Sequence, residues 1–377
     1  MSRVNMLIKQ CVCMVMALSP LPIWAQAEDS IQTPIDLVVV GPMVGTSFSV
    51  GVQLKTGVGI ALDTLPDGLL LGRPVRVSSL DDGCSKAIAE KVAHDLVQSP
   101  PAVVIGHSCS AATISAAPVY AENKVLQITP ASTNPLVTEM GIDTIFRMIG
   151  RDDVQGEMAA ERMSKVYKDQ QIGVLHFPSE YSLGLTQLAI RGLRARGIEP
   201  AKVIVSSPSA TSYLAEIQEL MAAGIEVLYI VGGGLDTGVF IRQSRLLDAP
   251  FKVISGDTLV SSVFYEAAGA AADEIPFTFP TDASQLGSAS DAMTALTNAG
   301  HEPSGYTLLS YAAIQVWIEG VTRAQSLEAD LVAAAIRSAP INTILGMISF
   351  DDKGDIQTSY PPFSWYVWRL GERVPID

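Results

Sequence analysis

The most constraining feature of the sequence is a regular alternation between short apolar runs and longer amphipathic segments. The runs are rich in Val and Ile, which is typical of buried strands. They lie at residues 35–40, 73–78, 102–105, 125–128, 171–176, 202–206, 226–231 and 251–255. Helical segments separate them at residues 50–65, 85–98, 110–122, 152–167, 182–196, 213–223 and 236–247. Such a series predicts parallel, doubly wound sheets, and two series in 377 residues predict two α/β lobes.

This architecture indicates where to search for a binding site. Open parallel sheets bind ligands beyond the carboxyl ends of their strands. The segments that directly follow the predicted strands are residues 41–48, 79–84, 106–110, 129–134, 177–182, 232–236 and 256–260.

The beginning of the chain has the pattern of a secretory signal peptide. Arg3 and Lys9 precede an apolar run over residues 11–21, and an A-x-A sequence ends at Ala27. We expect cleavage after Ala27 and export to the periplasm. An uncleaved membrane anchor is the alternative, but the run is shorter than the ~20 residues that span a bilayer.

The charge of the chain limits its partners. Lys and Arg number 25 against 39 Asp and Glu, which gives a net charge of −14. This balance argues against nucleic acid and against anionic lipid as main partners.

Two cysteines, Cys84 and Cys109, remain after removal of the signal peptide. In an exported chain a pair of cysteines favours one disulfide bond. The alternative is a reactive Cys109 beside His107, although positions i and i+2 give a base and its nucleophile a poor geometry.

Three of the loops after strands carry polar groups suited to one kind of ligand. Residues 106–110 open a helix and offer backbone N–H groups with the hydroxyls of Ser108 and Ser110, which suits a carboxylate. Thr133 in the 129–134 loop adds another hydroxyl, and Asp257 offers a carboxylate for an ammonium group. Together they are the recognition set of an α-amino acid, whereas taken singly each residue is equally consistent with a helix cap or a polar turn.

Several of these segments resemble one known family. G-H-x-C-S at 106–110, T-P-A-x-T-N-P at 129–135, D-D-x-C at 81–84 and G-x-x-x-F-D-x-x-G-D at 346–355 are similar to motifs of the periplasmic leucine/isoleucine/valine-binding proteins. The resemblance extends over nearly all of the mature chain, from Leu37 to Trp368.

The resemblance implies a type I periplasmic binding protein fold, with two α/β lobes, three crossover strands and the ligand in the cleft. Lobe 1 would comprise residues 28–150 and 278–343, and lobe 2 residues 151–277 and 344–377. It also implies a disulfide bond between Cys84 and Cys109.

The same resemblance assigns roles to individual residues. Ser110 would hold the ligand carboxylate, Ala131 and Thr133 would contact the carboxylate and the ammonium, and Asp257 and Tyr181 would close from lobe 2. No catalytic residue, metal or cofactor is expected.

The residues expected around the ligand side chain depart from the family pattern. Gly232-Gly233-Gly234 stands where members often place a tyrosine, and Val50 or Ser49 stands where an aromatic residue often covers the ligand. Phe48, Gly233 and Tyr306 are our candidates for this pocket.

Enzymatic functions find little support in the sequence. There is no G-x-G-x-x-G or G-x-S-x-G motif, and the four histidines suit no catalytic triad. We therefore expect a solute-binding protein that delivers a small amino acid to the membrane permease of an ABC importer. The alternatives are a ligand-sensing receptor component and a binding protein for a metabolite that is not an amino acid.

Overall fold

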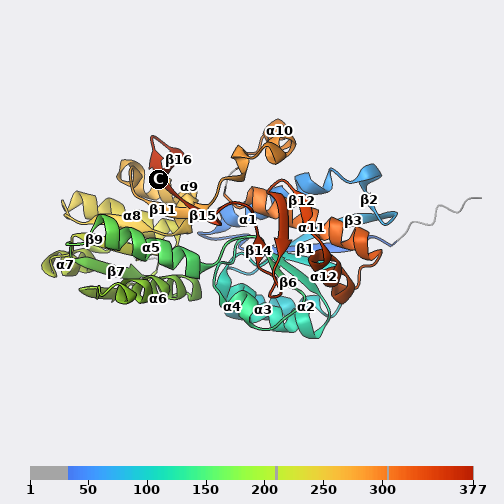
Figure 1. The fold of residues 1–377 in the computed structure, drawn as a ribbon, viewed down its shortest axis with the longest axis horizontal. Coiled ribbons are helices and arrows are strands. Elements are labelled where there is room, and N and C mark those ends of the chain that lie inside the picture. Colours follow the sequence, from blue (N-terminus) through green and yellow to red (C-terminus); the bar gives the residue numbers. More distant parts are fainter. Residues whose placement is uncertain (1–32, 209–210, 304, 377) are drawn as a thin grey trace, which may run out of the picture. The chain divides into compact units, whose positions relative to one another are not determined.

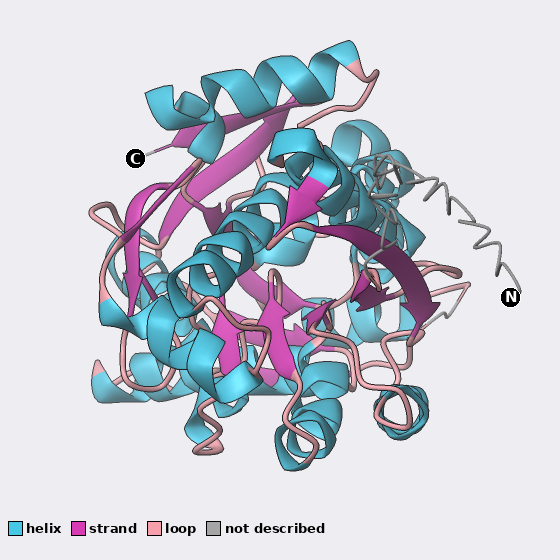
Figure 2. Cartoon of the chain, turned by 90° about the vertical axis from the view of Figure 1, so that its right-hand side faces the viewer, coloured by secondary structure: helices cyan, strands magenta, loops and turns pink. Residues whose placement is uncertain are grey.

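The computed structural model describes residues 33–208, 211–303 and 305–376. The predicted signal peptide lies outside this part of the chain. Two large mixed sheets, each covered by helices on both faces, form two lobes (Figures 1 and 2). The α/β fold class predicted from the sequence is confirmed. Within the described residues no helix is both long and apolar enough to cross a membrane.

The first sheet has the strand order β2-β3-β1-β4-β5-β6. All neighbours pair in parallel except the short edge strand β2. The strands are β1 (Ile35–Gly41), β2 (Leu69–Leu70), β3 (Arg73–Asp81), β4 (Val103–Gly106), β5 (Leu126–Thr129) and β6 (Ile145–Arg147). The helices of this part of the chain are α1 (Phe48–Leu62), α2 (Lys86–Leu96), α3 (Ser110–Glu122), α4 (Leu136–Glu139), α10 (Ser290–Asn298), α11 (Thr307–Ala324) and α12 (Ala329–Ser338).

Strand β1 shows why an unbroken apolar run occupies the centre of this sheet. Leu37 and Val39 pack in one hydrophobic cluster with residues of α1 and α11, while Val38 and Val40 pack in another with residues of α2 and α3. From Leu37 to Val40 both faces of the strand are therefore buried, and this stretch carries only apolar side chains.

The second sheet has the order β16-β15-β11-β10-β9-β7-β8. Strands β11 to β8 in this order are parallel, and β15 and β16 add an antiparallel edge. The strands are β7 (Ile172–His176), β8 (Lys202–Val205), β9 (Val227–Val231), β10 (Lys252–Ser255), β11 (Phe277–Pro280), β15 (Phe363–Arg369) and β16 (Glu372–Ile376). Its helices are α5 (Asp152–Val166), α6 (Glu180–Ala195), α7 (Leu214–Ala222), α8 (Gly234–Leu246) and α9 (Ser262–Ala268).

A small third sheet consists of β12 (Ile341–Thr343), β13 (Gly346–Phe350) and β14 (Ile356–Gln357). The eight strands and seven helices expected from the sequence are all confirmed. The sequence pattern did not predict the short strand β2, the strands β6 and β11, the strands after residue 340, or the helices α4, α9, α11 and α12. The expected lobe boundary between residues 277 and 278 falls inside β11, and these boundaries stay a prediction.

The disulfide bond between Cys84 and Cys109 is present. It joins the segment after β3 to the residue before α3. Beside it, the buried His107 accepts or donates hydrogen bonds at both ring nitrogens, Nδ1 to Asp82 (2.8 Å) and Nε2 to the Tyr120 hydroxyl (3.2 Å). The alternative of a reactive Cys109 with His107 as its base is therefore wrong.

We predict that replacing both cysteines by serine lowers the free energy of unfolding by about 3 kcal/mol, because the unfolded chain loses its covalent loop. The cysteines are 25 positions apart, so the loop is of moderate length. Urea unfolding of the mature protein and of the double variant measures the difference. An unchanged midpoint at unchanged slope would contradict the prediction.

Candidate functional site

Two loops after neighbouring strands of the first sheet bring the predicted carboxylate-binding residues together. One follows β4 and opens α3; the other follows β5. Ser108, Ser110, Ala131 and Thr133 are all buried. The Oγ of Ser110 accepts a hydrogen bond from the backbone N–H of Asn134 (3.3 Å), which ties the two loops to each other. The first turn of α3 carries no side-chain cap, so its N–H groups remain available to a carboxylate.

Asp257 lies at the carboxyl end of β10, where it is buried. Its carboxylate accepts hydrogen bonds from the hydroxyls of Tyr181 (2.6 Å) and Tyr306 (3.0 Å) and a longer one from Gln155 (3.4 Å). Burial raises the pKa of Asp257, while these three donors favour its charged form. A Cβ atom on Gly256 would lie 2.7 Å from the Tyr181 hydroxyl, so glycine at this position permits the close approach of Tyr181.

The structure adds a residue that sequence reasoning missed. Asp152, the first residue of α5, is fully buried and accepts a hydrogen bond from Gln155 Nε2 (3.0 Å). Its backbone N–H donates to the carbonyl of Thr133 (2.9 Å). Burial raises the pKa of Asp152 well above its ordinary value, and the charge of Asp257 raises it further. An aspartate in the first turn of a helix is ordinarily solvated, so its burial could not be predicted from the sequence.

Asp152 and Gln155 therefore connect the two halves of the predicted site. Gln155 Nε2 donates to both Asp152 and Asp257, and its Oε1 accepts from the hydroxyl of Thr278 (2.6 Å). Through these contacts the loop that contains Thr133 is joined to the acidic cluster around Asp257.

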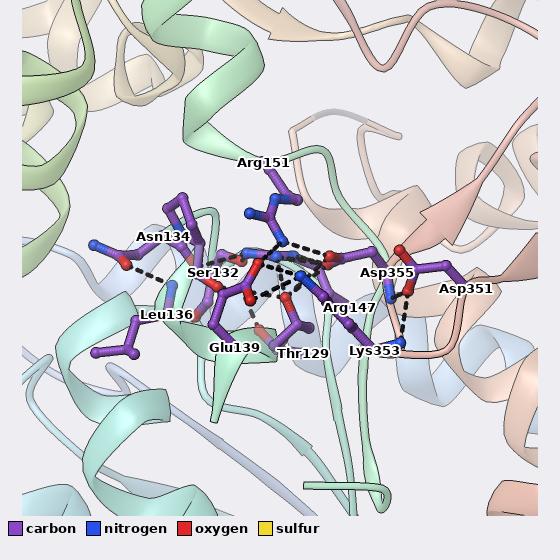
Figure 3. A network of polar contacts seen from close by, with 12 residues as sticks. Thr129, Ser132, Asn134, Leu136, Glu139, Arg147, Arg151, Asp351, Lys353 and Asp355 are labelled. Atoms are coloured by element: carbon purple, nitrogen blue, oxygen red, sulfur yellow. Dashed lines mark hydrogen bonds and ion pairs between the residues drawn. The ribbon is translucent and has the colours of Figure 1, made fainter. Parts of the chain in front are cut away.

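A buried ion pair stabilises the loop after β5, which contains Thr133 (Figure 3). Arg147, at the end of β6, is fully buried and donates from Nε (2.7 Å) and Nη2 (2.5 Å) to one carboxylate oxygen of Asp355. Its Nη1 donates to the backbone carbonyls of Asn134 (2.7 Å) and Ser132 (3.4 Å). The guanidinium thus fixes the carbonyls on either side of Thr133.

The outer part of this network is more exposed. Arg151 donates to Asp355 (2.9 Å), to Asp153 and to Glu139, and Lys353 completes the cluster through Glu139. The sequence motif at 346–355 contained Asp355, but nothing in it identified Arg147 as its partner.

Of the three residues expected around the ligand side chain, two are exposed and one is buried. Phe48 is 52 % exposed at the start of α1. Gly233, the residue before α8, is also exposed, and a Cβ atom on it would meet only Asp236, at 3.9 Å. Tyr306 is buried and belongs to the Asp257 cluster through its hydroxyl.

A cavity in another part of the structure does not involve the predicted site. It measures about 500 Å³ beside β11 and β15, and its walls include Phe279, Tyr366, Trp368 and Asp282. None of the predicted ligand-binding residues lines it. Phe279 lines this cavity and contacts the ring of Tyr306 edge to face (5.7 Å between ring centroids). The cavity is therefore separated from the Asp257 cluster by these two rings.

Comparison with known proteins decides the family. Residues 34–367 match the sequence profile described as periplasmic binding protein. The chain belongs to the periplasmic binding protein family. Its members are binding proteins rather than enzymes, and they act in the periplasm. The family predicted from the sequence motifs is thereby confirmed.

Individual relatives support the same assignment. The chain is 33 % identical over 332 residues to Leu/Ile/Val-binding protein homolog 1 of Brucella abortus, covering 88 % of this chain and 89 % of that protein. It is 28 % identical over 355 residues to the leucine-, isoleucine-, valine-, threonine- and alanine-binding protein of Pseudomonas aeruginosa, covering 94 % of each.

Solved structures of the family share the fold. A leucine-binding protein of Thermotoga maritima superposes with a TM-score of 0.83 at 25 % identity, covering 91 % of this chain and 98 % of that chain. A Rhodopseudomonas palustris solute-binding protein in complex with benzoate reaches 0.82 at 17 % identity, covering 91 % and 96 %, and this likeness concerns the fold alone.

We predict that Asp355→Asn lowers the free energy of unfolding by about 3–5 kcal/mol, because it leaves the buried Arg147 guanidinium without its counter-charge. The matched control is Glu199→Gln, which breaks the exposed pair with Arg194 and should change stability little. Denaturant unfolding of both variants measures the contrast. Equal effects of the two substitutions would contradict the role given to Asp355.

Proposed function

We propose that this periplasmic binding protein carries a small α-amino acid to the membrane permease of an ABC importer. The observation that supports this most directly is the connection of a carboxylate-binding loop pair to a buried acidic cluster. Ser110, Ala131 and Thr133 belong to the first and Asp257 to the second, and the contacts of Asp152 and Gln155 join them.

The proposed arrangement of the ligand follows from the two ends of this site. The ligand carboxylate takes the N–H groups at the start of α3 with the hydroxyls of Ser108, Ser110 and Thr133, since a helix N-terminus favours negative charge. The ligand ammonium binds the carboxylate of Asp257, which the hydroxyls of Tyr181 and Tyr306 orient. Phe48 and Gly233 remain the proposed neighbours of the ligand side chain.

Binding in this proposal proceeds by hinge closure. The ligand docks on the loops of lobe 1 (residues 28–150 and 278–343), and contacts from lobe 2 (residues 151–277 and 344–377) favour the closed state. An inter-lobe contact of this kind is the hydrogen bond from the Asn134 side chain to the backbone carbonyl of Glu180 (3.1 Å). Cleavage after Ala27 would release the mature chain to the periplasm.

The relatives point to the substrate class. The names of the Brucella and Pseudomonas proteins describe binding of branched-chain and other small amino acids. A benzoate complex on the same fold makes a metabolite without an amino group the second candidate.

A thermal-shift screen separates the two candidates. The mature protein, unfolded and refolded to remove bound ligand, is tested with L-amino acids, with the corresponding amides and amines, and with aromatic acids. A ligand at 100 times its Kd adds about 2.7 kcal/mol of stability. We expect shifts only from compounds with both a carboxylate and an ammonium. A shift from benzoate-like acids alone would favour the second candidate.

We further predict that Thr133→Ala weakens amino-acid binding by about 1–3 kcal/mol, because a buried hydrogen bond to the ligand is lost. Thr297→Ala on the exposed face of α10 is the matched control and should leave the affinity unchanged. Isothermal titration with the amino acid that gives the largest thermal shift measures both. Unchanged affinity of the Thr133 variant would remove this residue from the site.

A further inference from the structure

The acidic cluster contains two buried carboxylates where a single ammonium group would need only one. Asp152 and Asp257 are both buried, and they share the side-chain amide of Gln155, at 3.0 Å and 3.4 Å. Two carboxylates that share a site cannot both ionise easily, so they tend to hold one proton between them.

The groups around the pair leave its charge uncompensated. The hydrogen bonds to the two carboxylates come from uncharged donors: Gln155 and the Thr133 side chain for Asp152, and Gln155, Tyr181 and Tyr306 for Asp257. Burial raises the pKa of Tyr229 well above its ordinary value, and the charges of Asp152 and Asp257 raise it further, so this hydroxyl stays neutral.

Arg147 is the cation whose charge acts on Asp152, but its own hydrogen bonds go to other groups. It favours the charged form of Asp152, yet its nitrogens donate to Asp355, Thr138 and the carbonyls of the carboxylate-binding loop. Arg151 is likewise engaged with Asp355 and with the more exposed Asp153 and Glu139. Neither arginine makes an ion pair with Asp152 or Asp257 among the described residues.

Two buried polar atoms next to this pair lack a partner. Within the described part of the chain, Oδ2 of Asp152 and the hydroxyl of Tyr229 make no hydrogen bond. A buried ionised carboxylate with an oxygen unpaired is costly, whereas a shared proton or a ligand N–H removes the cost.

We propose that Asp152 and Asp257 share one proton in the ligand-free protein, and that the ammonium of the bound amino acid displaces it. Binding then releases one proton to solution: the ligand enters as a zwitterion, both carboxylates are ionised in the complex, and the total charge balances. The displacement of the proton by an ammonium rests on the proposed function. The shared proton does not, because it is a property of the ligand-free protein.

The direction of the pH dependence follows from the release. Below the pKa of the pair the ligand competes with a proton, so affinity rises about tenfold for each unit by which the pH rises. Above that pKa the affinity is independent of pH.

The first arm of the test needs no ligand. Infrared spectra of the ligand-free mature protein at neutral pH should contain the C=O stretching band of a protonated carboxyl group, since ordinary Asp and Glu are ionised there. The band should disappear in Asp152→Asn and persist in the matched control Asp153→Asn, whose carboxylate is 43 % exposed. Absence of the band in the wild-type protein would overturn the proposal.

The second arm measures proton release. L-alanine and L-leucine are titrated calorimetrically in phosphate and in Tris, whose ionisation enthalpies differ, so a released proton makes the apparent binding enthalpy depend on the buffer. We expect release of about one proton in the wild type and in Asp153→Asn, and none in Asp152→Asn.

The two possible failures are distinguishable. If the band is present and neither amino acid binds, the shared proton is supported and the proposed function fails. If an amino acid binds with no proton release, the displacement is overturned while the proposed function stands.

Discussion

The buried guanidinium of Arg147 is the constraint on which the proposed binding site depends. It lies at the end of β6 and satisfies backbone carbonyls on both sides of Thr133, while Asp355 supplies its counter-charge from the segment between β13 and β14. A loop after a strand is ordinarily free to vary its conformation. Here its carbonyls are fixed by a group that water does not reach, so the N–H and hydroxyl groups on its other side are held in place before any ligand arrives.

The same arrangement explains why Asp152 tolerates full burial. Its backbone N–H donates a hydrogen bond to the carbonyl of Thr133. It lies in the first turn of α5, at the positive end of the helix, and Gln155 one turn later donates a hydrogen bond to its side chain. These contacts reduce the cost of burying the carboxyl group without supplying a positive charge. The remaining cost is expressed as a raised pKa, which a cation beside the carboxylate would lower again by favouring its ionised form.

Much of the fold could be predicted from the sequence because burial on both faces leaves a plain apolar run. Val38 to Val40 in β1 and Val227 to Val231 in β9 are of this kind. Strand β11 was missed because Thr278 and Pro280 interrupt its run, and β6 because three residues are too few to form a pattern. Among the residues of the candidate site, Ser108, Ser110, Thr133 and Asp257 were predicted from their position in loops after strands, whereas Ala131 and Tyr181 were predicted only from the resemblance to the family. Asp152, Gln155 and Arg147 were not predicted, since their importance comes from partners 100 or more positions away, such as Asp257 and Asp355.

The two ends of the proposed site differ in how firmly the chain fixes them. The residues proposed to hold the ligand head group are buried and linked by hydrogen bonds from several elements, so a change at one of them disturbs the others. Phe48 and Gly233 at the proposed side-chain end are exposed, and the position of Gly233 has room for a larger side chain. Substitutions there carry little structural cost. Under the proposed function, substitutions of Phe48 or Gly233 therefore change the preference for the ligand side chain without disturbing the buried residues proposed to hold the α-amino acid group.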